Sequence, residues 1–384
     1  MRAARTLKSR ITFCAGFACL LSLAGAPSAY ALHRVGWVFA DQPDATAAYT
    51  PKAQYSFNSA KGSVTVTPGG GVTGGTYVVT FTKLYQNAPQ YVPDNVQISV
   101  ADGTSAHCTA GGWGQEDPSD TTANVTVQCY DKLGNPTNAA FTLLYQIRSA
   151  PFGSAANGLA FLVQGSAGSV AETTDPYNST GGNNMVTKSN QVGIGAGNYT
   201  VTLPGMTRIG GDVQVTSLYG ATEAGPAHCG LVRWTAAASR GTTITVQCYR
   251  DKNGSPNYSG FVLAYAIGEP FGTLLPGDGT LGGAWLFAND LRSTSPYTPL
   301  PSHQYNGFRT GPLTAQKIGT GTYAVTIPGA LTYSTSTALV TAVGAGNGYC
   351  NLAGWGHATV NVVCYNRAGA LADSRFNVTL QTAR

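Results

Sequence analysis

The chain contains few charged residues and few strong helix formers. Only 10% of its 384 residues are Asp, Glu, Lys or Arg, and it has three methionines. Apolar positions with a helical period are absent after the N-terminal segment, which argues against a helical protein. Glycine and tyrosine are abundant instead, with 49 and 20 residues. Short alternating runs bounded by Gly, Pro, Asn and Asp predict an all-β fold.

The chain also lacks an excess of positive charge once its first segment is set aside. Residues 1–31 combine four basic residues, the apolar run 11–23 and a small-x-small site at Ala29-Tyr30-Ala31. This pattern predicts a signal peptide and a secreted protein, extracellular or periplasmic. The remainder would carry 22 − 4 = 18 basic and 17 acidic residues, a net charge of +1. That balance favours no nucleic-acid partner, and no later apolar run could span a membrane.

Cysteine is sparse, and six of the eight cysteines belong to a cassette that occurs three times. Each copy has a cysteine, a tryptophan five positions later, and an alternating strand that ends in Cys-Tyr. Alternate residues of a strand share a face, so the second cysteine should point into an apolar core. The repeat selects one pairing, and we predict the disulfides Cys108–Cys129, Cys229–Cys248 and Cys350–Cys364. No Cys-x-x-Cys pair is present, so we expect neither a structural zinc site nor any other metal or cofactor.

The repeat extends well beyond the cassette. Every copy also has a Gly-x-Tyr strand and a closing strand that begins with Phe141, Phe261 or Phe376. The period of about 120 residues is the size of a domain and far exceeds a solenoid unit. We therefore predict three tandem, jelly-roll-like β-sandwich domains, each with one internal disulfide. The predicted boundaries are a signal peptide at 1–31 and domains at 32–150, 151–270 and 271–384, with seams at Pro151-Phe152-Gly153 and Pro270-Phe271-Gly272.

The combined motif can be written Gly-x-Tyr-x-Val-Thr, Cys-x4-Trp and Val-x-Val-x-Cys-Tyr, followed by the closing Phe strand. In this form it resembles repeats of secreted bacterial proteins of largely unassigned function. The resemblance covers nearly all of the chain after residue 31. It implies secretion and a β fold, and it transfers no catalytic residue.

Motifs for catalysis are weak. No serine nucleophile elbow is present, and the scattered histidines are expected at the surface or in loops. Glu116 and Asp117 lie in the long loop of the first cassette, where a solvated loop is favoured over a catalytic or calcium-binding pair. Asp131, Asp251 and Asn366 follow the second cysteine and are expected to support turns. A hydrolase that uses Glu116, Asp117 or His357 is the least favoured function.

Recurring aromatic residues are the strongest candidates for binding. Exposed rings beside amide and carboxylate groups can stack on the apolar face of a sugar. The alternative is structural, with tryptophans covering disulfides and tyrosines capping sheet edges. We predict a secreted, non-enzymatic protein that binds a glycan or a cell surface through three linked sites. A surface-associated structural protein without a small ligand is the alternative. The candidate residues are Trp113, Trp234, Trp355, Tyr130, Tyr249 and Tyr365.

Overall fold

The computed structural model describes residues 33–69, 74–88, 92–117, 119–148, 158–165, 173–188, 197–219, 226–268, 281–330, 334–356 and 358–383. The described residues do not include the predicted signal peptide, either Pro-Phe-Gly tripeptide or His357. The signal peptide and the domain boundaries therefore stay predictions. By its contacts, Leu32–Arg384 forms one compact unit. Neither short helical turn in the described part has the length or apolar character that a membrane crossing requires.

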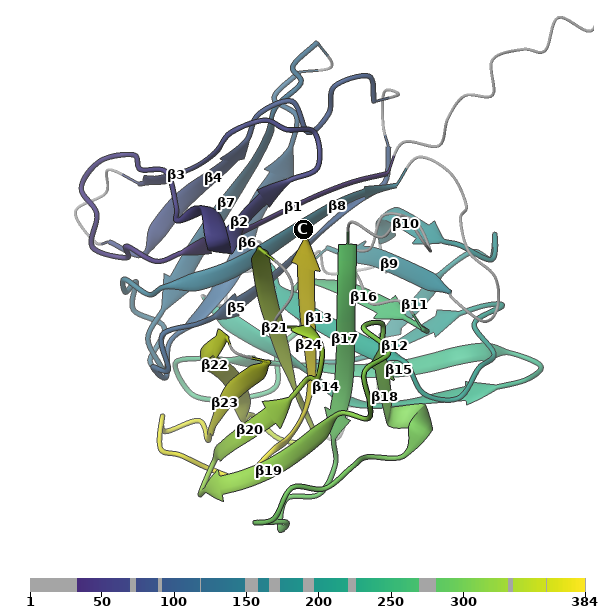
Figure 1. Ribbon diagram of the computed structural model, residues 1–384. Helices are drawn as coiled ribbons and strands as arrows, with labels where there is room; N and C mark the ends of the chain where they lie inside the picture. Colours follow the sequence, from purple (N-terminus) through teal and green to yellow (C-terminus); the bar gives the residue numbers. More distant parts are fainter. Residues whose placement is uncertain are drawn as a thin grey trace, which may run out of the picture. The chain divides into compact units, whose positions relative to one another are not determined.

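Within this unit, the described residues of each repeat form eight strands. Figure 1 colours them along the sequence. Repeat 1 comprises β1 (His33–Ala40), β2 (Ser56–Asn58), β3 (Val64–Pro68), β4 (Thr76–Phe81), β5 (Asp94–Val100), β6 (His107–Gly114), β7 (Ala123–Tyr130) and β8 (Phe141–Arg148). Repeat 2 comprises β9 (Leu159–Gln164), β10 (Thr173–Asn178), β11 (Met185–Lys188), β12 (Asn198–Leu203), β13 (Asp212–Ser217), β14 (Ala227–Ala237), β15 (Gly241–Arg250) and β16 (Phe261–Ala266). Repeat 3 comprises β17 (Leu281–Ala288), β18 (Gln304–Asn306), β19 (Thr314–Gly319), β20 (Thr322–Thr326), β21 (Thr335–Val343), β22 (Tyr349–Gly356), β23 (Thr359–Tyr365) and β24 (Arg375–Ala383). Among the described residues, the 3-10 turns η1 (Ala53–Tyr55) and η2 (Pro301–His303) precede β2 and β18.

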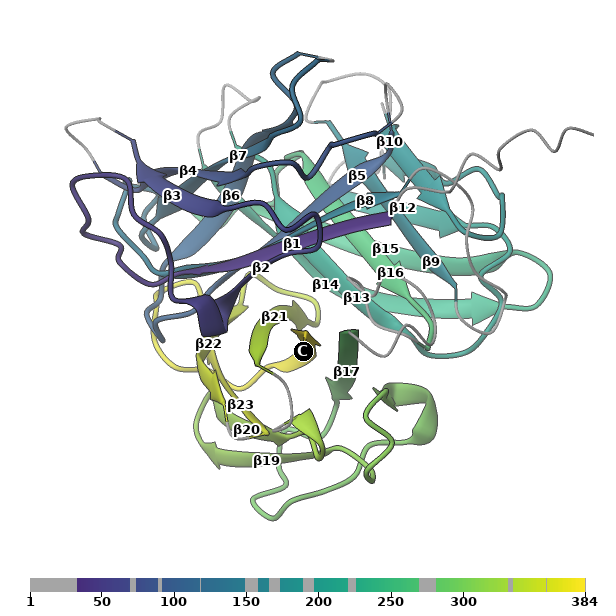
Figure 2. The ribbon, with the colours of Figure 1, turned by 45° about the horizontal axis from the view of Figure 1, so that its top comes forward.

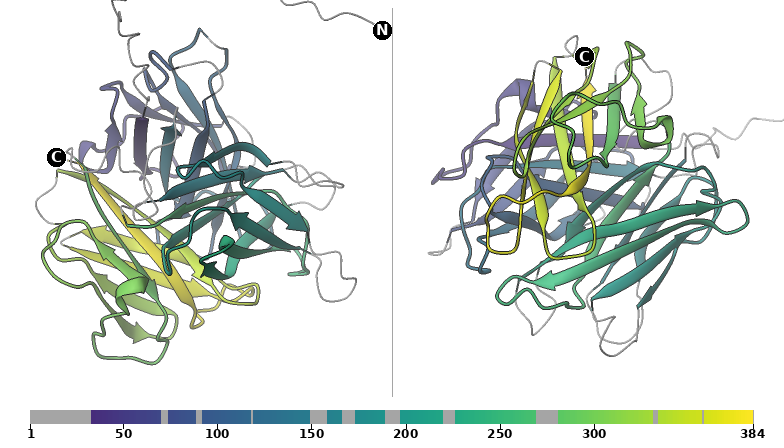
Figure 3. Two further views of the ribbon diagram at one scale, coloured as in Figure 1. Left: turned by 90° about the vertical axis from the view of Figure 1, so that its right-hand side faces the viewer. Right: turned by 90° about the horizontal axis from the view of Figure 1, so that it is seen from below.

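The predicted all-β sandwich is confirmed, and the strand order is the same in every repeat. In repeat 1 one sheet runs β2-β1-β8-β5 and the other β3-β4-β7-β6. In Figure 2 the strands β3, β4, β7 and β6 of the second sheet form one layer. Repeat 2 has the orders β10-β9-β16-β13 and β11-β12-β15-β14, and repeat 3 has β18-β17-β24-β21 and β19-β20-β23-β22. Figure 3 shows the green and yellow strands of repeat 3 side by side.

The space between the two sheets of each repeat is filled by the inward residues of alternating strands. Phe141 and Phe261, which begin β8 and β16, and Phe376, the second residue of β24, are fully buried there. The predicted disulfides are confirmed, and each joins the two neighbouring strands of a hairpin, as in β6 and β7. This pairing differs from the inter-sheet disulfide of an immunoglobulin domain.

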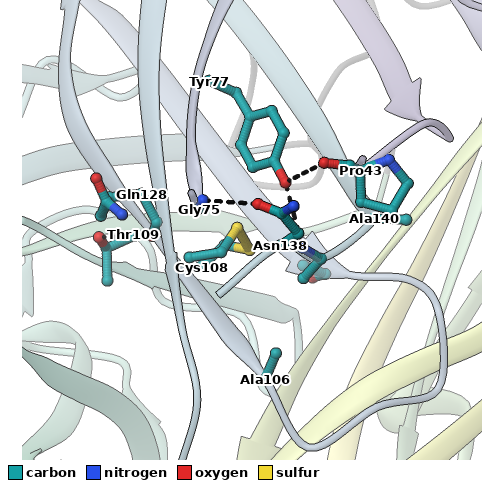
Figure 4. Close-up of a disulfide and its surroundings, with 12 residues drawn as sticks. Pro43, Gly75, Tyr77, Ala106, Cys108, Thr109, Gln128, Asn138 and Ala140 are labelled. Carbon is teal, nitrogen blue, oxygen red and sulfur yellow. Dashed lines mark hydrogen bonds between the residues drawn. A yellow bond between two sulfur atoms is a disulfide. The ribbon is translucent and has the colours of Figure 1, made fainter. Parts of the chain in front are cut away.

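The Gly-x-Tyr motif lies beside the disulfide. In repeat 1 its tyrosine joins the loop after β1 to the segment before β8. In repeat 1, Gly75 has φ of 75°, and a Cβ there would lie 2.7 Å from the carbonyl oxygen of Cys129, so only glycine fits. The hydroxyl of Tyr77 donates to the carbonyl of Pro43 at 3.0 Å and accepts from the backbone N–H of Ala139 at 3.3 Å (Figure 4). The motif therefore has a structural role, because it fixes the segment that enters the closing strand.

The three repeats are joined through their inner strands, β5, β13 and β21. The same bond occurs three times, from a backbone N–H of one inner strand to a side-chain hydroxyl of the next: Ile98 to Thr216 (2.9 Å), Val215 to Thr341 (3.1 Å) and Val340 to Ser99 (3.0 Å). The donors lie in repeats 1, 2 and 3, and the acceptors in repeats 2, 3 and 1. The set therefore closes a ring with approximate threefold symmetry. We call the contact between two successive repeats a seam, numbered 1/2, 2/3 and 3/1.

A second set of bonds follows the same cyclic order. The backbone carbonyl two residues after each first cysteine accepts an N–H from the next repeat: Ala110 from Tyr219 (2.7 Å), Leu231 from Gly344 (2.8 Å) and Leu352 from Gly103 (3.0 Å). At seam 2/3 this contact forms a parallel bridge between β14 and β21, so that two four-stranded sheets become one of eight strands. Each seam thus includes a cassette hairpin, the element that also carries the tryptophan of that repeat.

Candidate functional site

The second residue of each Cys-Tyr pair lies close to the axis of the ring. Tyr130, Tyr249 and Tyr365 are only 3%, 7% and 7% exposed. Each packs on the residue that precedes the first cysteine of its own repeat, with ring centroids 5.7, 5.8 and 5.8 Å apart: Tyr130 on His107, Tyr249 on His228 and Tyr365 on Tyr349. In this structure the tyrosines are part of the packed centre and present little ring surface to solvent.

His107, His228 and Tyr349 meet one another at the axis. Their ring centroids are 5.5–6.3 Å apart, and all three side chains are buried. The expectation that these two histidines lie at the surface or in exposed loops is therefore wrong. Viewed within a single repeat, the position looks like the end of a strand, but the neighbouring repeats cover it.

Asp251 links the two histidines across seam 1/2. Its Oδ2 lies 2.8 Å from Nε2 of His107, and its Oδ1 lies 2.7 Å from Nδ1 of His228. Burial on its own would raise the pKa of Asp251, but the two histidines outweigh burial and lower that pKa to about 2. The carboxylate is therefore charged at neutral pH and holds repeats 1 and 2 together.

The equivalents of Asp251 have the turn-supporting role that was expected. Asp131 accepts the backbone N–H groups of Leu133 and Asn135, at 2.8 and 2.9 Å. Asn366 accepts the corresponding pair in repeat 3. In repeat 2 the chain takes seven residues to return from Tyr249 to Pro256, against six from Tyr130 to Pro136. With the extra residue, Asn253 takes over the turn and Asp251 faces the axis.

A cavity of ≈ 60 Å³ lies beside these residues, where the inner strands and first cysteines of the three repeats meet. Its volume suits one or a few water molecules and is too small for an organic ligand. Among the described residues, no group of three or more His, Cys, Asp and Glu side chains is placed to hold a metal ion. The centre of the ring is thus a connecting element, and larger openings lie at the seams.

One such opening is lined by Trp355 at seam 3/1. Phe39 and Tyr55 of repeat 1 pack on this tryptophan with centroid distances of 5.1 and 5.4 Å. The groove has a volume of ≈ 670 Å³. We call it the Trp355 groove, and its polar lining includes Gln54, Ser334, Ser336, Thr359, Asn361 and Thr382. The described lining residues carry no charge.

A second opening is lined by Trp234 at seam 2/3. Phe287 of repeat 3 packs on Trp234 with centroids 4.8 Å apart, and His303 packs on Phe287 at 5.1 Å. This groove, called the Trp234 groove, has a volume of ≈ 590 Å³ and also contains Arg233 and Arg375. Burial lowers the pKa of His303, so its imidazole is neutral at pH 7.

The aromatic clusters beside the two grooves are built from the same three positions. Strand pairing places Phe39 and Phe287 at equivalent sites of β1 and β17, each opposite the residue that directly follows the closing-strand phenylalanine. Tyr55 and His303 each end the 3-10 turn that follows. In both grooves the tryptophan comes from one repeat, whereas the other two rings come from the next. Contact between two repeats therefore creates each groove, and neither lining belongs to a single repeat.

The indole N–H of each tryptophan is held within its own repeat. Trp355 donates to Oγ of Ser336 at 3.1 Å, and Trp234 donates to the carbonyl of Gly210 at 3.1 Å. Trp113 donates to the carboxylate of Asp94 at 2.6 Å. All three side chains are partly buried. These bonds fix the rings before any ligand arrives, which lowers the entropy cost of binding.

Seam 1/2 differs from the other two at one of these positions. Register places Val163 of β9 at the position of Phe39 and Phe287, so that strand offers Trp113 an aliphatic side chain in place of a ring. Phe161, the aromatic residue of that strand, is instead equivalent to Trp37 and stacks on Tyr177 at 5.0 Å. Trp113 is therefore a natural comparison for the other two tryptophans.

The acidic residues of the first cassette loop show no catalytic arrangement. Glu116 and Asp117 are exposed, and Asp117 accepts the backbone N–H of Ser119 at 2.6 Å. Hydrogen bonds from the hydroxyl and backbone N–H of Ser119 lower the pKa of Asp117. Its carboxylate is therefore ionised at neutral pH and accepts hydrogen bonds within the turn. Glu116 accepts from the side chain of Asn124 at 3.1 Å. These contacts organise the loop.

Comparisons with known proteins yield no relative: no family model, curated protein or solved structure matches the chain. The function must therefore be argued from the geometry alone.

Sequence reasoning identified the tryptophans but missed their partners. Phe39 and Tyr55 lie about 300 positions before Trp355, in a different repeat, so no local pattern connects them. A signal was nevertheless present, since an aromatic or imidazole ring follows the first strand at the same place in repeats 1 and 3. That signal acquires meaning only when the repeats are known to close into a ring.

Proposed function

We propose that this protein is a secreted, non-enzymatic binding protein that recognises carbohydrate through the Trp355 and Trp234 grooves. The observation that carries the proposal is the recurrence of one aromatic trio at two seams, each beside a groove of a size typical of ligand sites. The three disulfides suit an oxidising compartment, which supports secretion.

The Trp355 groove has the chemistry that a neutral sugar needs. A sugar ring offers an apolar face that stacks on an aromatic plane and hydroxyl groups that need hydrogen-bond partners. Trp355 and Tyr55 supply aromatic surface, while Gln54, Ser334 and Asn361 supply amide and hydroxyl groups. The amides can both donate and accept, which matches hydroxyl groups of either orientation.

Two grooves on one unit also favour a repetitive ligand. A polymer that occupies both grooves gains avidity, because its second contact forms at a high effective concentration. A glycan chain or a glycan-covered cell surface offers such repetition. The proposal therefore predicts tighter binding to polymers than to short oligosaccharides.

A glycan array probed with the full chain tests this function directly, using Trp355→Ala, Trp234→Ala and the double variant. We expect each single variant to lose about tenfold or more in affinity for its glycans, and the double variant to bind none. Trp113→Ala is the matched control, because it removes an equivalent tryptophan at the seam without the trio. Melting temperatures of all variants separate lost binding from lost folding.

Two results would overturn the proposal. One is a folded chain that binds no glycan on the array. The other is glycan binding that survives in the folded double variant. Concentration-dependent self-association together with the first result would instead favour the alternative, a structural protein without a small ligand.

A further inference from the structure

The two grooves differ at the positions that could carry charge. In the Trp234 groove, Arg233 follows the bulge of β14 and Arg375 begins β24. At seam 3/1 the equivalent positions, set by strand register, are Gly354, which lines the Trp355 groove, and Ala140, which is buried and precedes Phe141 as Arg375 precedes Phe376. The two arginines therefore occupy positions where seam 3/1 has two small, uncharged residues.

Both arginines face a groove that contains no acidic lining residue within the described part of the chain. They are exposed, and they come from opposite sides of seam 2/3, Arg233 from repeat 2 and Arg375 from repeat 3. The neighbouring His303 is neutral at pH 7, so the positive charge of the groove comes from the guanidinium groups. Guanidinium groups bind carboxylate and sulfate oxygens through paired, charge-assisted hydrogen bonds.

We propose that the Trp234 groove binds a sugar residue bearing an anionic group, whereas the Trp355 groove binds a neutral one. This inference rests on the proposed carbohydrate-binding function and adds its substrate class. Trp234 and Phe287 provide the aromatic platform, and the two arginines select the charge. A polymer that alternates neutral and acidic sugars could then engage both grooves of one chain.

The test uses an array that carries neutral, uronic-acid-containing and sulfated glycans, with the full chain and its Arg233→Gln/Arg375→Gln variant. We expect the variant to lose about tenfold or more in affinity for anionic glycans and to keep its neutral ones. Trp355→Ala should give the opposite pattern. Glutamine keeps polarity and much of the side-chain length, so the comparison isolates charge. The uronic-acid and sulfated arms distinguish carboxylate from sulfate as the anionic group.

Salt dependence is a second readout. Raising NaCl from about 20 to 500 mM should weaken binding to the anionic glycans and leave the neutral ones unchanged, because screening acts on charge pairs. Anionic binding that the arginine variant does not change would overturn this inference. Binding of only neutral glycans in the Trp234 groove would also overturn this inference, but it would not contradict the proposed function. If no glycan bound at all, the proposed function itself would fail and this inference with it.

Discussion

The inside of each sandwich and the seams between sandwiches are both buried, yet they consist of opposite residue types. Along β5, Val96 and Ile98 face the apolar core of repeat 1, whereas Gln97 and Ser99 face the other repeats. Both sets are less than 9% exposed. The core is held by apolar packing and the seams by hydrogen bonds that satisfy buried polar groups. Burial therefore does not reveal which kind of interaction stabilises a surface.

The largest effect is expected in a sandwich interior. Phe261→Ala removes a fully buried ring from the core of repeat 2 and should lower the free energy of unfolding by about 3–5 kcal/mol. Urea unfolding followed by tryptophan fluorescence measures it. Leu300→Ala is the control, because Leu300 is 62% exposed and its loss should cost less than about 0.5 kcal/mol. Equal effects of the two changes would contradict the assignment of the core.

A smaller but pH-dependent effect is expected at the axis. The lowered pKa of Asp251 means that its stabilising contribution is complete above the unfolded value near 4 and disappears as the pH falls towards about 2. Asp251→Asn should therefore cost on the order of 2–3 kcal/mol at pH 7 and progressively less below pH 4. Unfolding measured from pH 2 to 7 gives the profile. A variant whose deficit stayed constant over this range would refute the bridge between the histidines.

Removal of one hydroxyl from a seam should cost less again. Thr216→Val keeps the shape of the side chain but leaves the N–H of Ile98 and the side-chain oxygen of Gln97 without their partner. We expect a loss of about 1–3 kcal/mol in urea unfolding. Thr245→Val, on the outward face of β15, is the matched control and should be nearly neutral. If the two variants lost the same stability, the seam bonds would contribute nothing specific.

The smallest effect is expected at the position equivalent to Asp251 in repeat 1. Asp131→Asn keeps an acceptor for the backbone of its turn, and Asn366 already makes the same contacts in repeat 3. The change in unfolding free energy should stay within about 0.5 kcal/mol. A loss as large as that of Asp251→Asn would show that the two aspartates have the same role after all.

The sequence was sufficient for the disulfides and the buried strand faces that repeat in each sandwich, but not for the strand order. The threefold repeat of the cassette identified the disulfides, and alternation identified the inward face of β7, β15 and β23. By the same rule the polar residues of β5, β13 and β21 lie on the face opposite the core, and the structure shows that they contact other repeats. Alternation distinguishes the two faces of a strand and does not reveal what covers the polar face. This is the physical reason why the ring escaped prediction.

The candidate site was predictable only in part, for the same reason. Each tryptophan was found because its offset from the cysteine is constant. The rings that complete the grooves belong to the next repeat, and the axial role of Asp251 depends on one additional residue in its hairpin. Such contacts arise from the closure of the ring, which no pattern within a single repeat encodes.

Amide hydrogen exchange of the intact chain tests most directly whether the three repeats form this closed ring. The amides of Ile98, Val215 and Val340 donate to hydroxyl groups of the next repeat. The ring predicts that all three exchange as slowly as amides inside the sandwiches. If these three exchanged quickly while the sandwich amides remained protected, the repeats would be separate units, and the grooves at their seams would not exist.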